Sequence, residues 1–133
     1  MQKISNKFFV FINGGKDNTK VELFEWVKFL QDQGAGEILL NSIDRDGSGD
    51  GYDIDMIENV ISVIKIPLII LGGVGDFEDF EVGLNYEHVD AVAAANIFHY
   101  KDQSVYYAKK MLYEKGYNIR NPNLLNLELN EIL

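Results

Sequence analysis

Apolar residues in this chain occur in two patterns that alternate along the sequence. Short continuous runs rich in β-branched and aromatic residues predict strands at 8–12, 37–43, 67–71 and 89–95. Apolar residues at helical spacing predict helices at 21–33, 56–64, 77–84 and 102–115, the first capped by Asn18 or Thr19. Strands and helices therefore alternate four times, which is typical of a parallel α/β fold. The run 67–71 is apolar throughout, as expected of a strand covered on both faces.

Composition limits the possible classes of protein. The length of 133 residues and the 47% hydrophobic content predict one domain over 1–133, in which 121–133 is a tail of uncertain structure. A net charge of −9 argues against a nucleic-acid partner, because the phosphate backbone of a nucleic acid is also negatively charged. The absence of cysteine excludes disulfides and thiol chemistry. The apolar runs are too short for a membrane span, so we expect a cytoplasmic protein without a membrane partner.

Candidate chemistry lies in three loops that follow predicted strands: 44–51, 72–75 and 94–97. Ligands of parallel α/β folds bind at the carboxyl ends of strands. Glycine lets backbone N–H groups approach a phosphate closely, although glycine at a strand end is also a common requirement of turns. Taken together, the neighbouring loops predict a phosphate site. Asp46 is a candidate acid or base in the first loop, or else a solvated or capping residue.

The first loop also has the residue spacing of a calcium-binding EF-hand. The positions that match are Asp44, Asp46, Ser48 and Asp50 at 1, 3, 5 and 7, Gly49 at 6 and Asp55 at 12. Three features disfavour calcium: a strand precedes the loop, glycine occupies position 8, and position 12 is Asp rather than Glu. Calcium is therefore a minor alternative, and we expect neither a metal nor another cofactor.

Several of these segments together resemble a known family. They are GAGEILLNSIDRDG at 34–47, GYD at 51–53, PLIILGG at 67–73 and AANIFH at 94–99. This pattern is similar to the cyclase subunit of imidazole glycerol phosphate synthase, a lyase of histidine biosynthesis, from about Phe8 to Arg120. That family is a (β/α)8 barrel of two similar halves, each of which binds one phosphate of the substrate. The resemblance implies roughly the C-terminal half of such a TIM-type barrel, with 8–12 in an extension hairpin.

The resemblance also implies roles for individual residues. It assigns the phosphate site of the second half to Gly47, Gly72, Gly73, Ala95 and Asn96. It gives Asp46 an auxiliary catalytic role and places Asn41 and Ser42 at the substrate mouth. Asn96 replaces the family's usual Ser, and Asn41 replaces its usual Thr.

The family's two main catalytic aspartates end the first and fifth barrel strands, and neither lies in this chain. Whether the chain is an enzyme is therefore uncertain, and we expect it to be inactive alone. The expected partners are a phosphorylated small molecule, the glutaminase subunit of the full enzyme, and either the missing barrel half or a second copy. Two alternatives stay open: a paralogue in ammonia-dependent amidation of surface sugars, and a non-catalytic phosphate-binding or assembly module.

Overall fold

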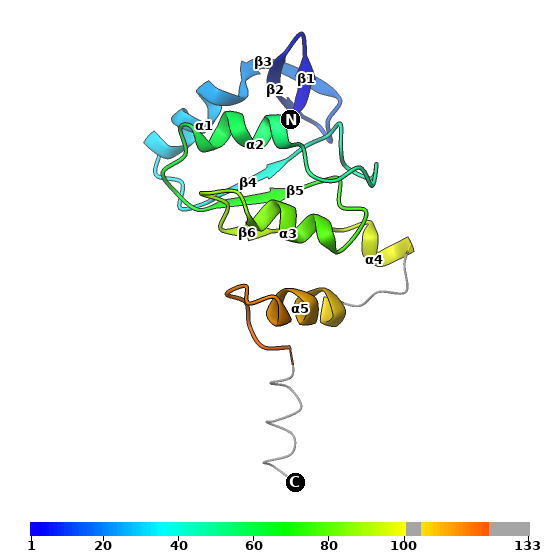
Figure 1. Ribbon diagram of the computed structural model, residues 1–133. Coiled ribbons are helices and arrows are strands. Elements are labelled where there is room, and N and C mark those ends of the chain that lie inside the picture. The colour runs from blue at the N-terminus through cyan, green and yellow to red at the C-terminus, as the bar shows by residue number, and fades with distance from the viewer. Residues whose placement is uncertain (101–104, 123–133) are drawn as a thin grey trace.

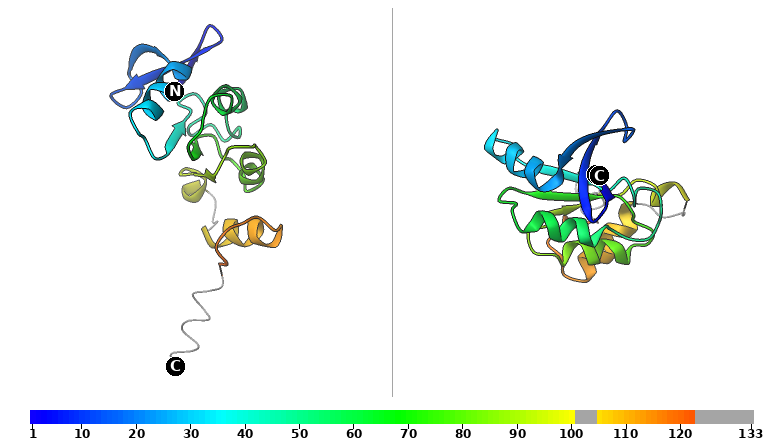
Figure 2. Two further views of the ribbon diagram at one scale, coloured as in Figure 1. Left: turned by 90° about the vertical axis from the view of Figure 1, so that its left-hand side faces the viewer. Right: turned by 90° about the horizontal axis from the view of Figure 1, so that it is seen from above.

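The computed structural model describes residues 1–100 and 105–122. Two three-stranded sheets lie one after the other along the chain (Figure 1). The first is antiparallel with the order β1-β2-β3, and the second is parallel with the order β4-β5-β6. Helices α2 and α3 lie side by side along the parallel sheet, while α5 lies beyond the β6 edge (Figures 1 and 2). Most of the predicted tail 121–133, namely residues 123–133, lies outside the described residues.

The antiparallel sheet consists of β1 (Gln2–Ile4), β2 (Lys7–Ile12) and β3 (Asp17–Glu22). Ser5 and Asn6 both have positive φ, 49° and 64°, which is the backbone of a two-residue hairpin turn. The sheet is therefore a small hairpin extension ahead of the parallel units, as the family resemblance implies.

The residue pattern alone was wrong about this region in two respects. The run 8–12 belongs to the antiparallel sheet and not to the parallel one. The helix expected from 21 begins later, as α1 (Leu23–Asp32), because β3 occupies the preceding residues. Thr19 does not cap that helix: its hydroxyl donates to the carbonyl oxygen of Val10 across the hairpin at 2.8 Å.

The parallel units agree closely with the sequence. Their elements are β4 (Ile38–Asn41), α2 (Ile54–Ile61), β5 (Leu68–Leu71), α3 (Glu78–Leu84), β6 (Ala91–Val92), α4 (Ile97–Tyr100) and α5 (Val105–Glu114). The short helix α4 was not predicted, and β6 is shorter than the predicted strand 89–95. The prediction of parallel β/α units is confirmed.

Helix α2 shows how the local sequence builds these units. The Asp53 carboxylate accepts the backbone N–H of Met56 at 3.2 Å and caps the helix at its first turn. Met56, Ile57 and Val60 then form a buried stripe against the sheet. The hydroxyl of Ser42, just after β4, donates to the other oxygen of Asp53 at 2.9 Å. The end of β4 and the start of α2 are therefore held together.

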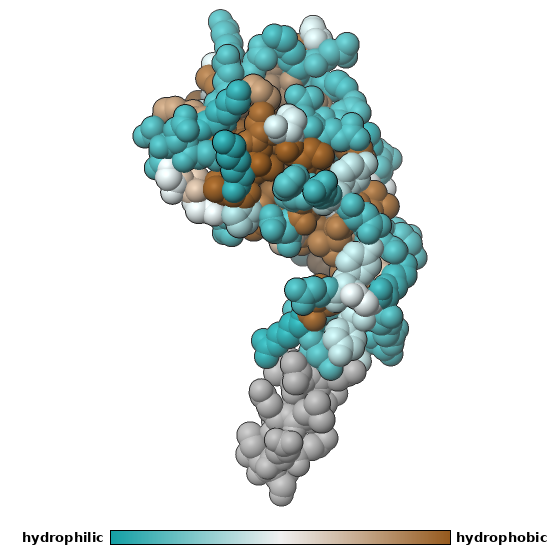
Figure 3. Space-filling model, turned by 60° about the vertical axis from the view of Figure 1, so that its left-hand side comes forward, coloured by the Kyte–Doolittle hydropathy of each residue, from teal (hydrophilic) through white to brown (hydrophobic). Residues whose placement is uncertain are grey.

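The parallel sheet is buried mainly on its helix face. Leu40 is 1% exposed, whereas its neighbour Leu39, which points to the opposite face, is 57% exposed. The same alternation occurs in β5, where Leu68 and Ile70 are buried and Ile69 is half-buried. The expectation that β5 is covered on both faces is therefore not met by the part of the chain that the structure describes. Apolar surface is visible on one side of the molecule in Figure 3.

No described helix is both long enough and apolar enough to cross a membrane.

The two faces of β4 predict different responses to the same substitution. We expect Leu40→Ala to lower the free energy of unfolding by about 3 kcal/mol, because it leaves a cavity in the core. Leu39→Ala should lower it by less than about 1 kcal/mol, because that side chain is already largely in water. Urea denaturation at low protein concentration measures both variants. Equal losses would show that the second face of the sheet is also covered.

Candidate functional site

The loops that follow β4, β5 and β6 meet at the carboxyl ends of the three parallel strands. Together with the end of β5 they line a single cleft, which we call the cradle. Its lining residues are Asp46, Gly47, Leu71, Gly72, Gly73, Val74, Ala94, Ala95 and Asn96. Every residue predicted for the phosphate site, and Asp46 with them, is therefore in one place. The open space of the cradle is about 10 Å³, room for about one water molecule, so a larger ligand would sit at its mouth.

The first two loops touch backbone to backbone. The N–H of Gly51 donates to the carbonyl oxygen of Gly73 at 2.8 Å. A Cβ atom at Gly73 would overlap the carbonyl group of Gly51, and a Cβ at Gly75 would overlap the carbonyl of Gly49. Gly73 also has a φ of +107°, in the region that side chains disfavour. These loops can pack in this way only because glycine stands at both contacts.

Asp79 in α3 holds the second loop from the other side. One of its carboxylate oxygens accepts the backbone N–H groups of Gly75 and Asp76, at 2.8 and 3.0 Å. The other oxygen lies beside Gly51, where a Cβ atom would approach it to 3.1 Å. Asp79 is therefore placed to fix the shape of the second loop and its distance from the first.

The third loop contributes Ala95 and Asn96. The N–H of Ala93 donates to the carbonyl of Ile70 at 2.8 Å, which aligns the start of this loop with β5. The side-chain amide nitrogen of Asn96 lies over Gly47, 2.8 Å from where a Cβ would stand. Asn96 therefore reaches across from the third loop to the first.

Asn41 and Ser42 point to opposite faces of β4. The Oδ1 atom of Asn41 is buried, and no donor in the described part of the chain satisfies it. The hydroxyl of Ser42 faces Asp53 in the helix layer. The predicted place of these residues at the substrate mouth stays a prediction, and of the two side chains only that of Asn41 is turned away from the helices.

The aspartates of the calcium-like spacing do not converge. Asp44 accepts the backbone N–H of Lys3 at 2.7 Å, and Asp55 pairs with the Lys3 ammonium at 2.5 Å. That ammonium lowers the pKa of Asp55 through the hydrogen bond. Within residues 1–100 and 105–122, no group of three or more His, Asp or Glu is arranged to hold a metal ion. These two aspartates instead attach the hairpin to the first parallel unit.

Charge in the cradle comes from a single lining side chain, the carboxylate of Asp46. The guanidinium of nearby Arg45 is engaged with the carbonyl oxygen of Asp50 at 3.1 Å. An anion at the cradle would therefore be attracted by backbone dipoles and by the Asn96 amide rather than by a lysine or arginine in the lining.

Comparison with known proteins shows the family of this chain. The family model described as "Histidine biosynthesis protein" matches residues 2–104. The chain belongs to this family. The resemblance noted in the sequence is confirmed.

Individual relatives are similar over most of this chain. It is 44% identical over 113 residues to the imidazole glycerol phosphate synthase subunit HisF of Nitrosopumilus maritimus, which is 85% of this chain and 42% of the relative. The corresponding protein of Chlorobium phaeobacteroides is 41% identical over 120 residues, 90% of this chain and 48% of the relative. That of Natranaerobius thermophilus is 44% identical over 119 residues, 90% and 47%. The chain spans about half the length of the curated relatives it matches.

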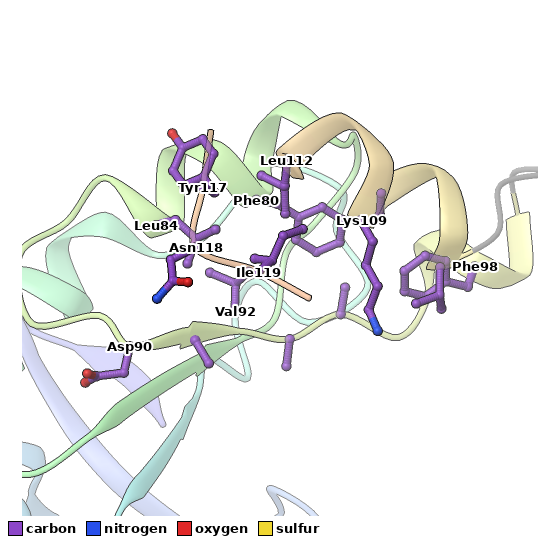
Figure 4. Close-up of a pocket in the computed structure, with 15 residues that line it drawn as sticks. Phe80, Leu84, Asp90, Val92, Phe98, Lys109, Leu112, Tyr117, Asn118 and Ile119 are labelled. Atoms are coloured by element: carbon purple, nitrogen blue, oxygen red, sulfur yellow. The ribbon is translucent and has the colours of Figure 1, made fainter. Parts of the chain in front are cut away.

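A larger cavity of about 600 Å³ lies elsewhere in this member of the family, between β6, α3 and α5. Figure 4 shows Phe80, Leu112 and Ile119 gathered around it from three different segments. Lys109 and Asp90 lie toward its two ends (Figure 4). Its mainly apolar lining lacks the convergent polar groups of the cradle, so we take it as the space beside the β6 edge rather than as the site of chemistry.

Sequence reasoning missed Asp79 and gave no role to Tyr52. Tyr52 is buried, and its hydroxyl donates to the carbonyl of Ala93 at 3.0 Å. Burial, together with the negative charge of Asp79, raises the pKa of Tyr52. The GYD string at 51–53 marked this position, but only the folded chain shows which loops the tyrosine joins.

The glycine contact between the loops can be tested with two alanine substitutions. Gly73→Ala should lower the free energy of unfolding by more than about 2 kcal/mol, because the new Cβ overlaps Gly51 and the φ is unfavourable. Gly36→Ala is the control: its Cβ meets open space, and we expect a change within about 0.5 kcal/mol. Thermal unfolding followed by circular dichroism measures both. Equal stability of the two variants would contradict the close packing of the loops.

Proposed function

We propose that this chain is part of the cyclase subunit of imidazole glycerol phosphate synthase and supplies one of its two phosphate sites. The observation that carries the proposal is the convergence of Gly47, Gly73 and Asn96 at one cleft on the carboxyl ends of three parallel strands. In barrels of parallel strands, ligands bind at the carboxyl ends of the strands. The family membership and the names of the relatives support the same function.

Phosphate would be held by neutral donors. Gly47, Gly72 and Gly73 all have positive φ, from +81° to +107°, a conformation in which successive N–H groups can form a concave anion site. The Asn96 amide at the same cleft adds a side-chain donor. An anion binding here does not need to displace an existing salt bridge in the cradle lining.

The complete reaction needs more than this chain contains. In the full enzyme, as the resemblance implies, ammonia from a glutaminase partner is used to convert a ribulosyl-formimino carboxamide nucleotide into imidazole glycerol phosphate and an aminoimidazole carboxamide ribotide. This is acid/base chemistry without a cofactor. Asp46, exposed at the rim of the cradle, is suited to an auxiliary proton transfer.

The open face of the sheet suggests the form of the missing partner. A (β/α)8 barrel has eight strands, and this sheet has three. The exposed Leu39 and the half-buried Ile69 lie on the face that would line a closed barrel. We therefore favour the remaining strands of the barrel as the partner over a second copy, which would bring the total to only six. A cytoplasmic location fits an enzyme of amino-acid biosynthesis.

The paralogue in surface-sugar amidation remains the second candidate. It is favoured by the two departures from the family pattern, Asn41 and Asn96. Asn96 lines the cradle and the Asn41 side chain lies beside Gly72, so both substitutions would change the groups offered to a ligand. The non-catalytic assembly module is favoured only by the open sheet face.

The proposal predicts activity only after completion of the barrel. We expect no ammonia-dependent turnover of the histidine-pathway substrate by this chain alone, because the main catalytic aspartates are absent. Mixing it with the first half of the Chlorobium phaeobacteroides relative should produce turnover, measured by the change in absorbance as the substrate is consumed.

Two controls make this result specific. Gly73→Ala in the mixture should reduce turnover at least tenfold, whereas Gly36→Ala should leave it unchanged. Turnover by the isolated chain would contradict the proposal, and turnover of a sugar substrate instead would favour the paralogue.

A further inference from the structure

Tyr52 spans the distance between two of the three cradle loops. It follows β4 in sequence, yet its hydroxyl donates to Ala93, just before the third loop. Its ring passes next to Gly83 in α3, where a Cβ atom would come within 2.8 Å of the tyrosine Cε2 atom. With only 4% of its surface exposed, the ring cannot move without disturbing α3.

The first and second loops have their own direct connection through Gly51 and Gly73. The third loop leaves the opposite edge of the sheet, because β6 and β4 lie on either side of β5. The Ala93 N–H bond to Ile70 ties the start of the third loop to β5, so a direct link between the third loop and the first has to reach past β5. The Tyr52 side chain does so, since it begins next to Gly51 and ends at Ala93.

We propose that Tyr52 is a positioning residue for the cradle: its hydrogen bond to Ala93 holds Ala95 and Asn96 at the distance from Gly47 that one phosphate requires. This inference rests on the proposed phosphate site and adds a residue that does not itself touch the ligand. Loss of the hydroxyl leaves the ring in place and keeps the bond from the Ala93 N–H to Ile70. It removes the link from the first loop and leaves the Ala93 carbonyl without this donor.

Tyr52→Phe is the sharpest test because it removes one oxygen and keeps the buried ring. Inorganic phosphate is titrated into the full 133-residue chain by calorimetry, and unfolding is measured in parallel. We expect phosphate affinity to fall about fivefold, the size of one lost hydrogen bond, and amide hydrogen exchange at Ala95 and Asn96 to become faster. Tyr117→Phe is the matched control, because its hydroxyl donates to Asn85 on the surface at 2.8 Å, away from the cradle lining.

The outcomes separate this inference from the proposed function. If the unaltered chain binds phosphate and Tyr52→Phe binds it equally well, the positioning role is overturned, even if the variant unfolds more easily. If Tyr117→Phe weakens phosphate binding as much as Tyr52→Phe does, the effect is general and the role is also overturned. If the unaltered chain binds no phosphate, the proposed site fails and this role fails with it.

Discussion

The close approach of two backbones, at Gly51 and Gly73, is the contact on which the site depends. A peptide carbonyl lies where any larger residue at position 73 would place its Cβ atom, so the loops after β4 and β5 can meet only through glycine. The contact brings Gly47, Gly72 and Gly73 into one cleft. Asp79 and Tyr52 then fix the second and third loops relative to the first.

A second constraint comes from the sheet itself. Its helix face is packed to the density of a core, with Leu40, Leu68 and Ile70 at most 1% exposed. Its other face has apolar residues such as Leu39, and no layer from residues 1–100 or 105–122 covers it. The described chain therefore combines the three loops of the proposed phosphate site with a parallel sheet of three strands. This combination agrees with the length, about half that of the curated relatives.

Local patterns in the sequence predicted the parallel units well. The alternation of apolar runs and helical stripes located β4, β5, α2 and α3 because each of them buries one regular face. The same reasoning failed at 17–22, where polar residues form a strand: Thr19 is held there by a bond to Val10 across the hairpin, and no local rule shows that bond. Apolar runs also look alike whether one or both faces are covered, so the exposure of Leu39 was not predictable.

Part of the candidate site could also be predicted from the sequence. Glycines that follow strands can be recognised in a sequence, and parallel strands bring their carboxyl ends together. The residues that line the cradle could therefore be predicted from the order of strands and loops along the chain. Contacts between residues that are distant in the sequence could not be predicted in this way. The bond from Tyr52 to Ala93 joins residues 41 positions apart, and the direction of the Ser42 hydroxyl depends on where Asp53 lies in the folded chain.

The most direct measurement is a crystal structure of this chain grown with inorganic phosphate. The account predicts one tetrahedral anion at the mouth of the cradle, within hydrogen-bond distance of backbone N–H groups in the loops of Gly47, Gly73 and Asn96. A crystal in which the phosphate occupies only another place, or in which the three loops stand apart, would contradict it.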